Sequence, residues 1–175
     1  MLTLITGPFG SGKTTQLLRL YRLAQSRGVT VAGVICPAVF EKQRKIGIDA
    51  LLLPSEELLR LAERSSPNAA VRAGEQQTMW KFDTEVFTAV NQHLDSCVAL
   101  LPELLIIDEL GPQELLYGRG YTSALALLDR GLYADALVVV RPSLLDTALQ
   151  RWGQSRVVDI TSDDELLDGT VLPIG

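Results

Sequence analysis

Short continuous runs of apolar residues recur through the chain, separated by stretches in which apolar residues return every three or four positions. The continuous runs are rich in branched aliphatic residues, which is typical of buried strands. Pro37 and Pro54 end two of these runs. The predicted strands are residues 2–6, 29–36, 46–53, 80–82, 104–107, 136–140 and 156–160, with residues 171–174 as a further strand at the sheet edge.

Helical periodicity falls between these strands. Apolar residues at positions 17, 18, 21 and 24 lie on one face of a helix that ends near Gly28, because glycine favours the position just after a helix. Asp83 or Thr84 can cap a second helix, whose apolar side carries positions 86, 90, 94 and 98. Further helices are predicted at residues 121–128 and 144–152, and Ser162 with Glu165 forms a capping box for a short one.

Strands that alternate with helices at this spacing predict an α/β fold with a mainly parallel, doubly wound sheet, in a single domain over residues 1–175. The polar residues 40–45 lie between two strands and predict a hairpin-like, antiparallel connection. Residues 56–64 fit either a short helix or a returning strand. Residues 65–77 hold few large apolar side chains, so we expect an exposed loop there.

Composition narrows the choice of partners. The 175 residues carry a net charge of −5, and the densest basic cluster is the short segment 42–45. Nucleic acids and anionic membranes bind electropositive faces, so the charge argues against both. The apolar runs are too short to span a bilayer, no signal peptide is recognisable, and two cysteines are too few for a disulfide scaffold. We therefore expect a cytoplasmic protein, and the sequence indicates no particular protein partner.

Residues 7–14 fit the pattern G-x-x-x-x-G-K-[ST] of the phosphate-binding loop, between a predicted strand and a predicted helix. The glycines let backbone N–H groups approach phosphate oxygens, and the start of the helix adds its positive dipole. Lys13 supplies a charge for the β- and γ-phosphates, and the Thr14 hydroxyl suits a Mg²⁺ ligand. The expected nucleotide-binding residues are Gly7, Pro8, Phe9, Gly10, Ser11, Gly12, Lys13, Thr14 and Thr15.

A second acidic segment is expected to complete this site. The apolar strand 104–107 leads directly into Asp108 and Glu109. A carboxylate here can hold Mg²⁺ opposite Thr14, which is the role we assign to Asp108. Side chains alternate along a strand, so Glu109 points elsewhere, towards the γ-phosphate, where it can orient and polarise a water molecule. An acidic residue at this position favours a water-activating nucleoside-triphosphatase over a kinase.

Several other residues have less specific signals. Arg141 follows the strand 136–140 and fits either a contact with the γ-phosphate or a solvated arginine before a turn. Arg119 lies between two glycines in a loop that could close over the site, although a loop arginine is more often only solvated. Arg44 and Lys45 fit a solvated hairpin tip better than a phosphate contact. His93, the only histidine, is expected on the surface of a helix and not at a metal.

With these segments in place, the chain resembles the small nucleoside-triphosphatase family of thermophilic type, which includes the cancer-related nucleoside-triphosphatases. The resemblance runs through most of the chain. It rests on four segments, at residues 7–15, 44–49, 80–83 and 106–115. The middle two discriminate best, because phosphate-binding loops occur in many unrelated proteins.

The resemblance implies a RecA-like, additional-strand P-loop fold and Mg²⁺-dependent hydrolysis of several nucleoside triphosphates to diphosphates. It gives Lys13 and Thr14 the phosphate and metal roles, Asp108 the second metal contact and Glu109 the water. Two departures stand out. Many members carry Lys and Met where Pro112 and Gln113 stand here, and an Asn-Arg-Asp-like stretch where residues 161–164 read Thr-Ser-Asp-Asp. Base preference therefore cannot be transferred.

Two other functions stay open from the sequence. A small-molecule kinase or other P-loop transferase would need an acceptor pocket and a lid that carries arginine, for which only the segments around Arg44 and Arg119 are available. A regulatory binding module with slow hydrolysis would use the loops at 65–77 and 118–120 as nucleotide-dependent switches. The acidic residue Glu109 is the feature that favours hydrolysis over both.

Overall fold

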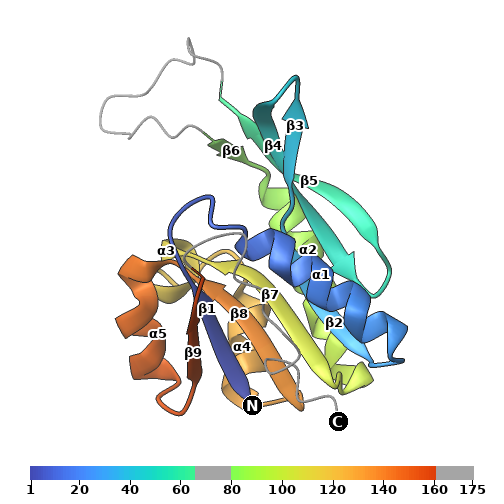
Figure 1. Cartoon of the computed structure of the whole chain (residues 1–175), viewed down its shortest axis with the longest axis vertical. Coiled ribbons are helices and arrows are strands. Elements are labelled where there is room, and N and C mark those ends of the chain that lie inside the picture. The colour runs from blue at the N-terminus through green and yellow to red at the C-terminus, as the bar shows by residue number, and fades with distance from the viewer. Residues whose placement is uncertain (66–79, 161–175) are drawn as a thin grey trace.

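The computed structural model describes residues 1–65 and 80–160, whose strands join in one mixed sheet (Figure 1). The sheet order is β6-β5-β4-β2-β7-β8-β1-β9, and β3 pairs with β4 beside this path. The strands are β1 (Leu2–Thr6), β2 (Val31–Ile35), β3 (Ala38–Glu41), β4 (Arg44–Leu53), β5 (Glu57–Arg64), β6 (Trp80–Phe82), β7 (Leu104–Leu110), β8 (Asp135–Val140) and β9 (Arg156–Asp159).

The parallel half of the sheet has β1 between β8 and β9, and β7 between β8 and β2. Strand β8 therefore separates the strand before the phosphate-binding loop from the strand that carries the acidic residues. This is the additional-strand arrangement that the resemblance implied. All four pairings are parallel, so the carboxyl ends of these strands meet at one edge of the sheet.

Helices cover both faces of the sheet, which confirms the doubly wound prediction. Figure 1 shows α1 in front of the sheet and α4 behind it. Leu17, Leu20 and Tyr21 of α1 pack with β1, β2 and β7 in one core, while α2, α4 and α5 contribute to the core on the other face. The helices are α1 (Lys13–Ser26), α2 (Thr84–Cys97), α3 (Pro112–Leu115), α4 (Thr122–Arg130) and α5 (Leu145–Arg151), with short 3₁₀ turns η1 (Val98–Leu100) and η2 (Pro142–Leu144).

Strands β3 to β6 form an antiparallel extension of the sheet beyond β2, seen at the top of Figure 1. The predicted connection at 40–45 is a hairpin, but the strands run further than expected and leave only Lys42 and Gln43 in the turn. Both residues have positive φ, of 46° and 65°, as a tight hairpin turn requires. The ambiguous segment 56–64 is a strand, β5, because its neighbours β4 and β6 complete its hydrogen bonding.

Two further differences concern the segment around the acidic residues. Strand β7 extends to Leu110, so Asp108 and Glu109 lie inside the strand, at an irregularity in its pairing with β8 between Ile107 and Leu110. The residues after Gly111 form the short helix α3, which was not among the predicted helices and begins with Pro112, since proline is tolerated at the first position of a helix.

The cap of α2 is as predicted, since the Asp83 side chain accepts a hydrogen bond of 2.8 Å from the Glu85 amide. The predictions for the short helix after Ser162 and the strand 171–174 lie outside the described residues, as does almost all of the loop 65–77. Among the described residues, no helix combines the length and apolar character needed to cross a membrane.

Candidate active site

The phosphate-binding loop connects β1 to α1 at the carboxyl edge of the sheet. Gly7 lies so close to the backbone of Ile160 that a Cβ atom would come within 2.1 Å of its carbonyl oxygen, and its φ of 147° disfavours any side chain. The Lys13 ammonium donates hydrogen bonds to the carbonyl oxygens of Gly7 at 2.9 Å and Pro8 at 2.8 Å. The Lys13 side chain therefore folds back onto the loop.

Asp108 brings the loop and β7 together. Its side chain is only 3% exposed, and it accepts a hydrogen bond of 3.1 Å from the backbone amide of Cys36, at the end of β2. The Thr14 side chain also hydrogen-bonds to it, and Lys13 acts on it electrostatically. Burial raises the pKa of Asp108 to about 6, while the bonds from Cys36 and Thr14 oppose that rise. The two segments that the sequence predicted to form one site are thus in contact.

Glu109, the next residue of β7, is far more accessible than Asp108, with a side-chain exposure of 30%. Its carboxylate forms an ion pair with the guanidinium of Arg141, through the Arg141 Nε atom. Arg141 directly follows β8, the strand between β1 and β7, at the carboxyl edge of the sheet. The structure therefore groups Glu109 and Arg141 beside Asp108 and Thr14.

Glu114 is a carboxylate that the sequence analysis did not assign to the site. It is only 5% exposed and accepts hydrogen bonds from the backbone amides of Gly111 at 2.8 Å and Tyr121 at 3.0 Å. Burial raises its pKa, and the two amide bonds oppose the shift. It holds both ends of the loop that follows Glu109. The sequence contains a signal for this role, because a glutamate at the third position of a helix often caps that helix.

Lys45 and Arg44, which the sequence left as a solvated hairpin tip, have different surroundings. The Lys45 ammonium lies 5.8 Å from the ring centre of Phe9 in the phosphate-binding loop and 5.0 Å from that of Trp80 in β6. Arg44 instead lines an open groove on the extension. The extension therefore reaches the loop through Lys45, and this contact was not predicted.

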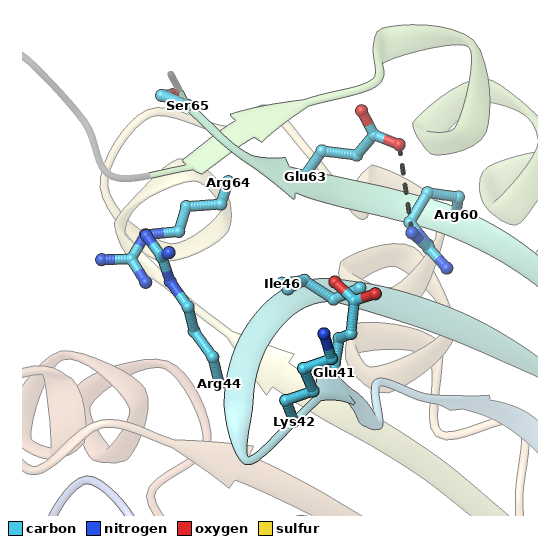
Figure 2. A pocket seen from close by; sticks show the side chains of 8 residues that line it. All are labelled: Glu41, Lys42, Arg44, Ile46, Arg60, Glu63, Arg64 and Ser65. Carbon is cyan, nitrogen blue, oxygen red and sulfur yellow. Dashed lines mark ion pairs between the residues drawn. The ribbon is translucent and has the colours of Figure 1, made fainter. Parts of the chain in front are cut away.

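Figure 2 shows the groove, whose side chains come from β3, β4, β5, the hairpin turn and Ser65 just after β5. Arg60 and Glu63 form an ion pair of 3.9 Å along its wall. Its lining residues are Glu41, Lys42, Arg44, Ile46, Arg60, Glu63, Arg64 and Ser65. No residue of the phosphate-binding loop is among them, and neither are Asp108 and Glu109.

The remaining candidates lie away from the acidic pair or have structural contacts. Arg119 is exposed, and its backbone amide donates a hydrogen bond of 2.7 Å to the carbonyl oxygen of Gln113. His93 is half-buried in α2 and contacts the carbonyl oxygen of Leu53 at 3.0 Å and the Cys97 sulfur at 3.6 Å. Residues 1–65 and 80–160 contain no cluster of three or more His, Cys, Asp or Glu side chains that could hold a metal ion.

Thr14 and Asp108 do provide a pair of oxygen donors that suits a metal-bound phosphate. Magnesium usually takes only one or two protein ligands and completes its shell with phosphate oxygens and water. A hydroxyl and a carboxylate in contact with each other, next to the Lys13 ammonium, match this chemistry. The residues present therefore fit a divalent cation held jointly by the protein and a polyphosphate.

Comparison with known proteins gives a consistent result. The model of the family described as NTPase matches residues 3–165. The chain is 32% identical to the nucleoside-triphosphatase THEP1 of Hyperthermus butylicus over 143 residues, which cover 81% of this chain and 72% of that protein. It is 30% identical to THEP1 of Sulfolobus acidocaldarius over 111 residues, 63% of this chain and 60% of that protein. The chain thus spans about three fifths of the length of some curated relatives.

Two solved structures share the fold. The solution structure of a human cancer-related nucleoside triphosphatase superposes with a TM-score of 0.68 at 22% identity, covering 91% of this chain and 88% of that one. The crystal structure of THEP1 from Aquifex aeolicus superposes with a TM-score of 0.64 at 14% identity, covering 94% and 92%. At these identities the likeness concerns the fold.

Proposed function

The chain belongs to the NTPase family, and from this premise we propose that it is a Mg²⁺-dependent hydrolase that converts nucleoside triphosphates to nucleoside diphosphates and phosphate. One observation carries the proposal. Thr14 of the phosphate-binding loop hydrogen-bonds to the buried Asp108, and the accessible carboxylate of Glu109 follows it directly in β7. Phosphate binding, metal binding and water activation thereby fall to residues that lie together.

Each residue has a distinct part in this mechanism. Loop amides and Lys13 bind the phosphates, and Thr14 with Asp108 holds the cation. When bound, Mg²⁺ neutralises charge on the β- and γ-phosphates. Burial raises the pKa of Asp108, so a bound cation would favour the ionised form of its carboxylate.

Glu109 activates the nucleophile. It orients a water molecule whose oxygen forms a bond to the γ-phosphorus while the bond from that phosphorus to the bridging oxygen breaks. The nucleoside diphosphate leaves with the bridging oxygen, and the proton lost by the water passes through the Glu109 carboxylate to solvent or phosphate. Water is the acceptor, so no second substrate is needed.

Arg141 is proposed to stabilise negative charge on the γ-phosphate during this step. Its ion pair with Glu109 already places the guanidinium beside the water-activating group. The arginine is supplied by the same chain, directly after the strand next to β1, and resembles an arginine finger in its chemistry. A triphosphate would draw Arg141 towards its own oxygens and leave the Glu109 carboxylate free to accept a proton.

The test is phosphate release from a panel of Mg²⁺-nucleoside triphosphates with no other substrate present. We expect turnover by the natural chain, and E109Q should lower kcat by about 100-fold or more while nucleotide affinity changes little. The amide keeps the size of the side chain but accepts protons poorly. The matched control is E57Q, which alters an exposed glutamate of β5 and should leave kcat unchanged.

Two outcomes would overturn the proposal in different ways. Undiminished turnover by E109Q would remove Glu109 from water activation. Tight nucleotide binding without phosphate release by the natural chain would point to a transferase that needs an acceptor, or to a regulatory module.

A further inference from the structure

Strand β4 is irregular beside Lys45. In the pairing of β3 with β4, Val39 lies opposite Gly47 but Phe40 lies opposite Lys45, so β4 contains one extra residue at this point. Such a β-bulge bends a strand and changes the direction of the side chains next to it, and bulges are frequent beside active sites. The local geometry of the extension therefore depends on the segment that includes Lys45.

Two aromatic rings hold the Lys45 side chain. Phe9 belongs to the phosphate-binding loop and is 95% exposed, which is unusual for a large apolar residue. The Lys45 ammonium lies 5.8 Å from its ring centre and 5.0 Å from that of Trp80. Contacts of this length are within the range of cation–π attraction. Lys45 thus connects the extension with the loop that is proposed to bind phosphates.

The electrostatic surroundings of Lys45 also connect it with the candidate active site. Partial burial lowers the pKa of Lys45, because it disfavours the charged ammonium. The carboxylates of Glu109 and Asp108 oppose this shift, because they attract the ammonium. The ammonium therefore lies within electrostatic range of the acidic pair that is proposed to serve the metal and the water. Lys13 approaches from α1 and Arg141 from β8, so Lys45 brings a third cation from a different direction.

We propose that Lys45 is a further catalytic residue, which contacts the γ-phosphate of a bound nucleoside triphosphate from the antiparallel extension. The inference rests on the proposed function, because Glu109 marks the γ-phosphate side of the site. Charge in the transition state is spread over three equatorial phosphate oxygens, so a third cation beside Lys13 and Arg141 would stabilise it further. Phe9 and Trp80 position the ammonium without neutralising it.

The position of the contact gives a specific expectation for binding. A residue that touches only the γ-phosphate adds affinity for a triphosphate and none for a diphosphate. A lysine that only holds the extension against Phe9 would change the affinities for the triphosphate and the diphosphate equally, or would change neither. The difference between the two affinities therefore separates a phosphate contact from a structural role.

The experiment uses K45M, which keeps the length and packing of the stem but removes the charge. We expect kcat to fall at least tenfold, the Kd for a non-hydrolysable triphosphate to rise about fivefold or more, and the Kd for the diphosphate to stay within twofold. K45R should retain most of the preference for the triphosphate, because it keeps the cation. K81M removes an exposed lysine of β6, which β5 separates from β4, and should match the natural chain in all three measurements.

A second measurement needs no variant. In the natural chain, an amine-reactive reagent followed by mass spectrometry should label Lys45 more slowly with the triphosphate present than with the diphosphate. Equal protection by the two nucleotides, or equal loss of both affinities in K45M, would overturn the assignment. If the natural chain binds triphosphates but does not hydrolyse them, the proposed function fails, and the affinity contrast still decides the role of Lys45.

Discussion

The Asp108 carboxylate lies almost wholly out of water, yet three parts of the chain surround it. The amide of Cys36 follows β2, Thr14 lies in the first turn of α1, and Glu109 shares the strand of Asp108. The residue types of this site are visible in the sequence. The burial that raises the pKa of Asp108 is not, because it depends on β2 and α1 packing against β7. The functional consequence of one carboxylate is therefore set by its neighbours in space.

Arg141 provides a test of a single contact. R141A removes the guanidinium that pairs with Glu109, and we expect kcat to fall by roughly 100-fold or more with little change in the Kd for a diphosphate. R141K should restore only part of the activity, since an ammonium cannot bind two oxygens in the planar manner of arginine. Steady-state kinetics would check this. The control is R130A, which removes an exposed arginine at the end of α4. Normal turnover by R141A would show that Arg141 has no part in catalysis and forms only a surface ion pair.

Helices α4 and α5 show how pairs of elements are fastened together. Asp129 near the end of α4 accepts hydrogen bonds from Arg151 Nε at 2.9 Å and from the Trp152 indole at 3.0 Å. Hydrogen bonds from Arg151 are the main reason that the pKa of Asp129 is lowered. The same two helices bury apolar side chains against one face of the sheet. The ion pair therefore adds to an interface that packing already determines.

This link predicts a pH-dependent stability. The pKa of Asp129 is lower in the folded state than in the unfolded state. Its contribution to the free energy of unfolding is therefore present above about pH 4 and is lost as the pH falls through the folded pKa. D129N should destabilise the protein by less than about 1 kcal/mol at pH 7, since the pair is partly exposed to solvent. The difference in stability between the natural chain and D129N should shrink as the pH is lowered from 6 to about 3.

Urea unfolding at several pH values measures this difference. D95N, an exposed aspartate of α2, is the matched control and should follow the natural chain at each pH. A difference between D129N and the natural chain that stays constant down to pH 3 would contradict the assigned sign.

The antiparallel extension was only partly predictable. Its hairpin was expected from polar residues between two apolar runs, but β5 could not be distinguished from a helix by composition. Pairing with β4 and β6 decided the conformation, because strands depend on partners that are distant in sequence. The bulge near Lys45 had no recognisable signal for the same reason, and with it the contact between the extension and Phe9.

For the molecule as a whole, the strand order is the decisive feature. Strands β1 and β7 are separated by β8, and residues from the ends of all three strands and from α1 meet at one edge. A ligand that contacts all of them binds the folded chain and not the unfolded one. Nucleotide binding is therefore linked to global stability.

We expect a non-hydrolysable triphosphate with Mg²⁺, at about 100 times its Kd, to stabilise the fold by about 2.7 kcal/mol and raise Tm by roughly 5–10 °C. K13A should show a much smaller rise, because the loop loses its charge for the β- and γ-phosphates. Chelation of the metal should reduce the rise in the natural chain. Thermal unfolding followed by circular dichroism checks all three, and an equal rise in K13A would argue against the phosphate-binding loop as the site.

The order of residues was enough to identify the α/β class, the phosphate-binding loop and the acidic segment, because each depends on neighbours within a few positions. Periodicity reports local burial, and the glycine and lysine spacing of the loop reports local backbone chemistry. Folding in three dimensions decided which of these segments meet. The separation of β1 from β7 by β8, the pairing of Arg141 with Glu109, the anchoring of a loop by Glu114 and the approach of Lys45 to Phe9 all join residues far apart in the chain, which a local pattern does not encode.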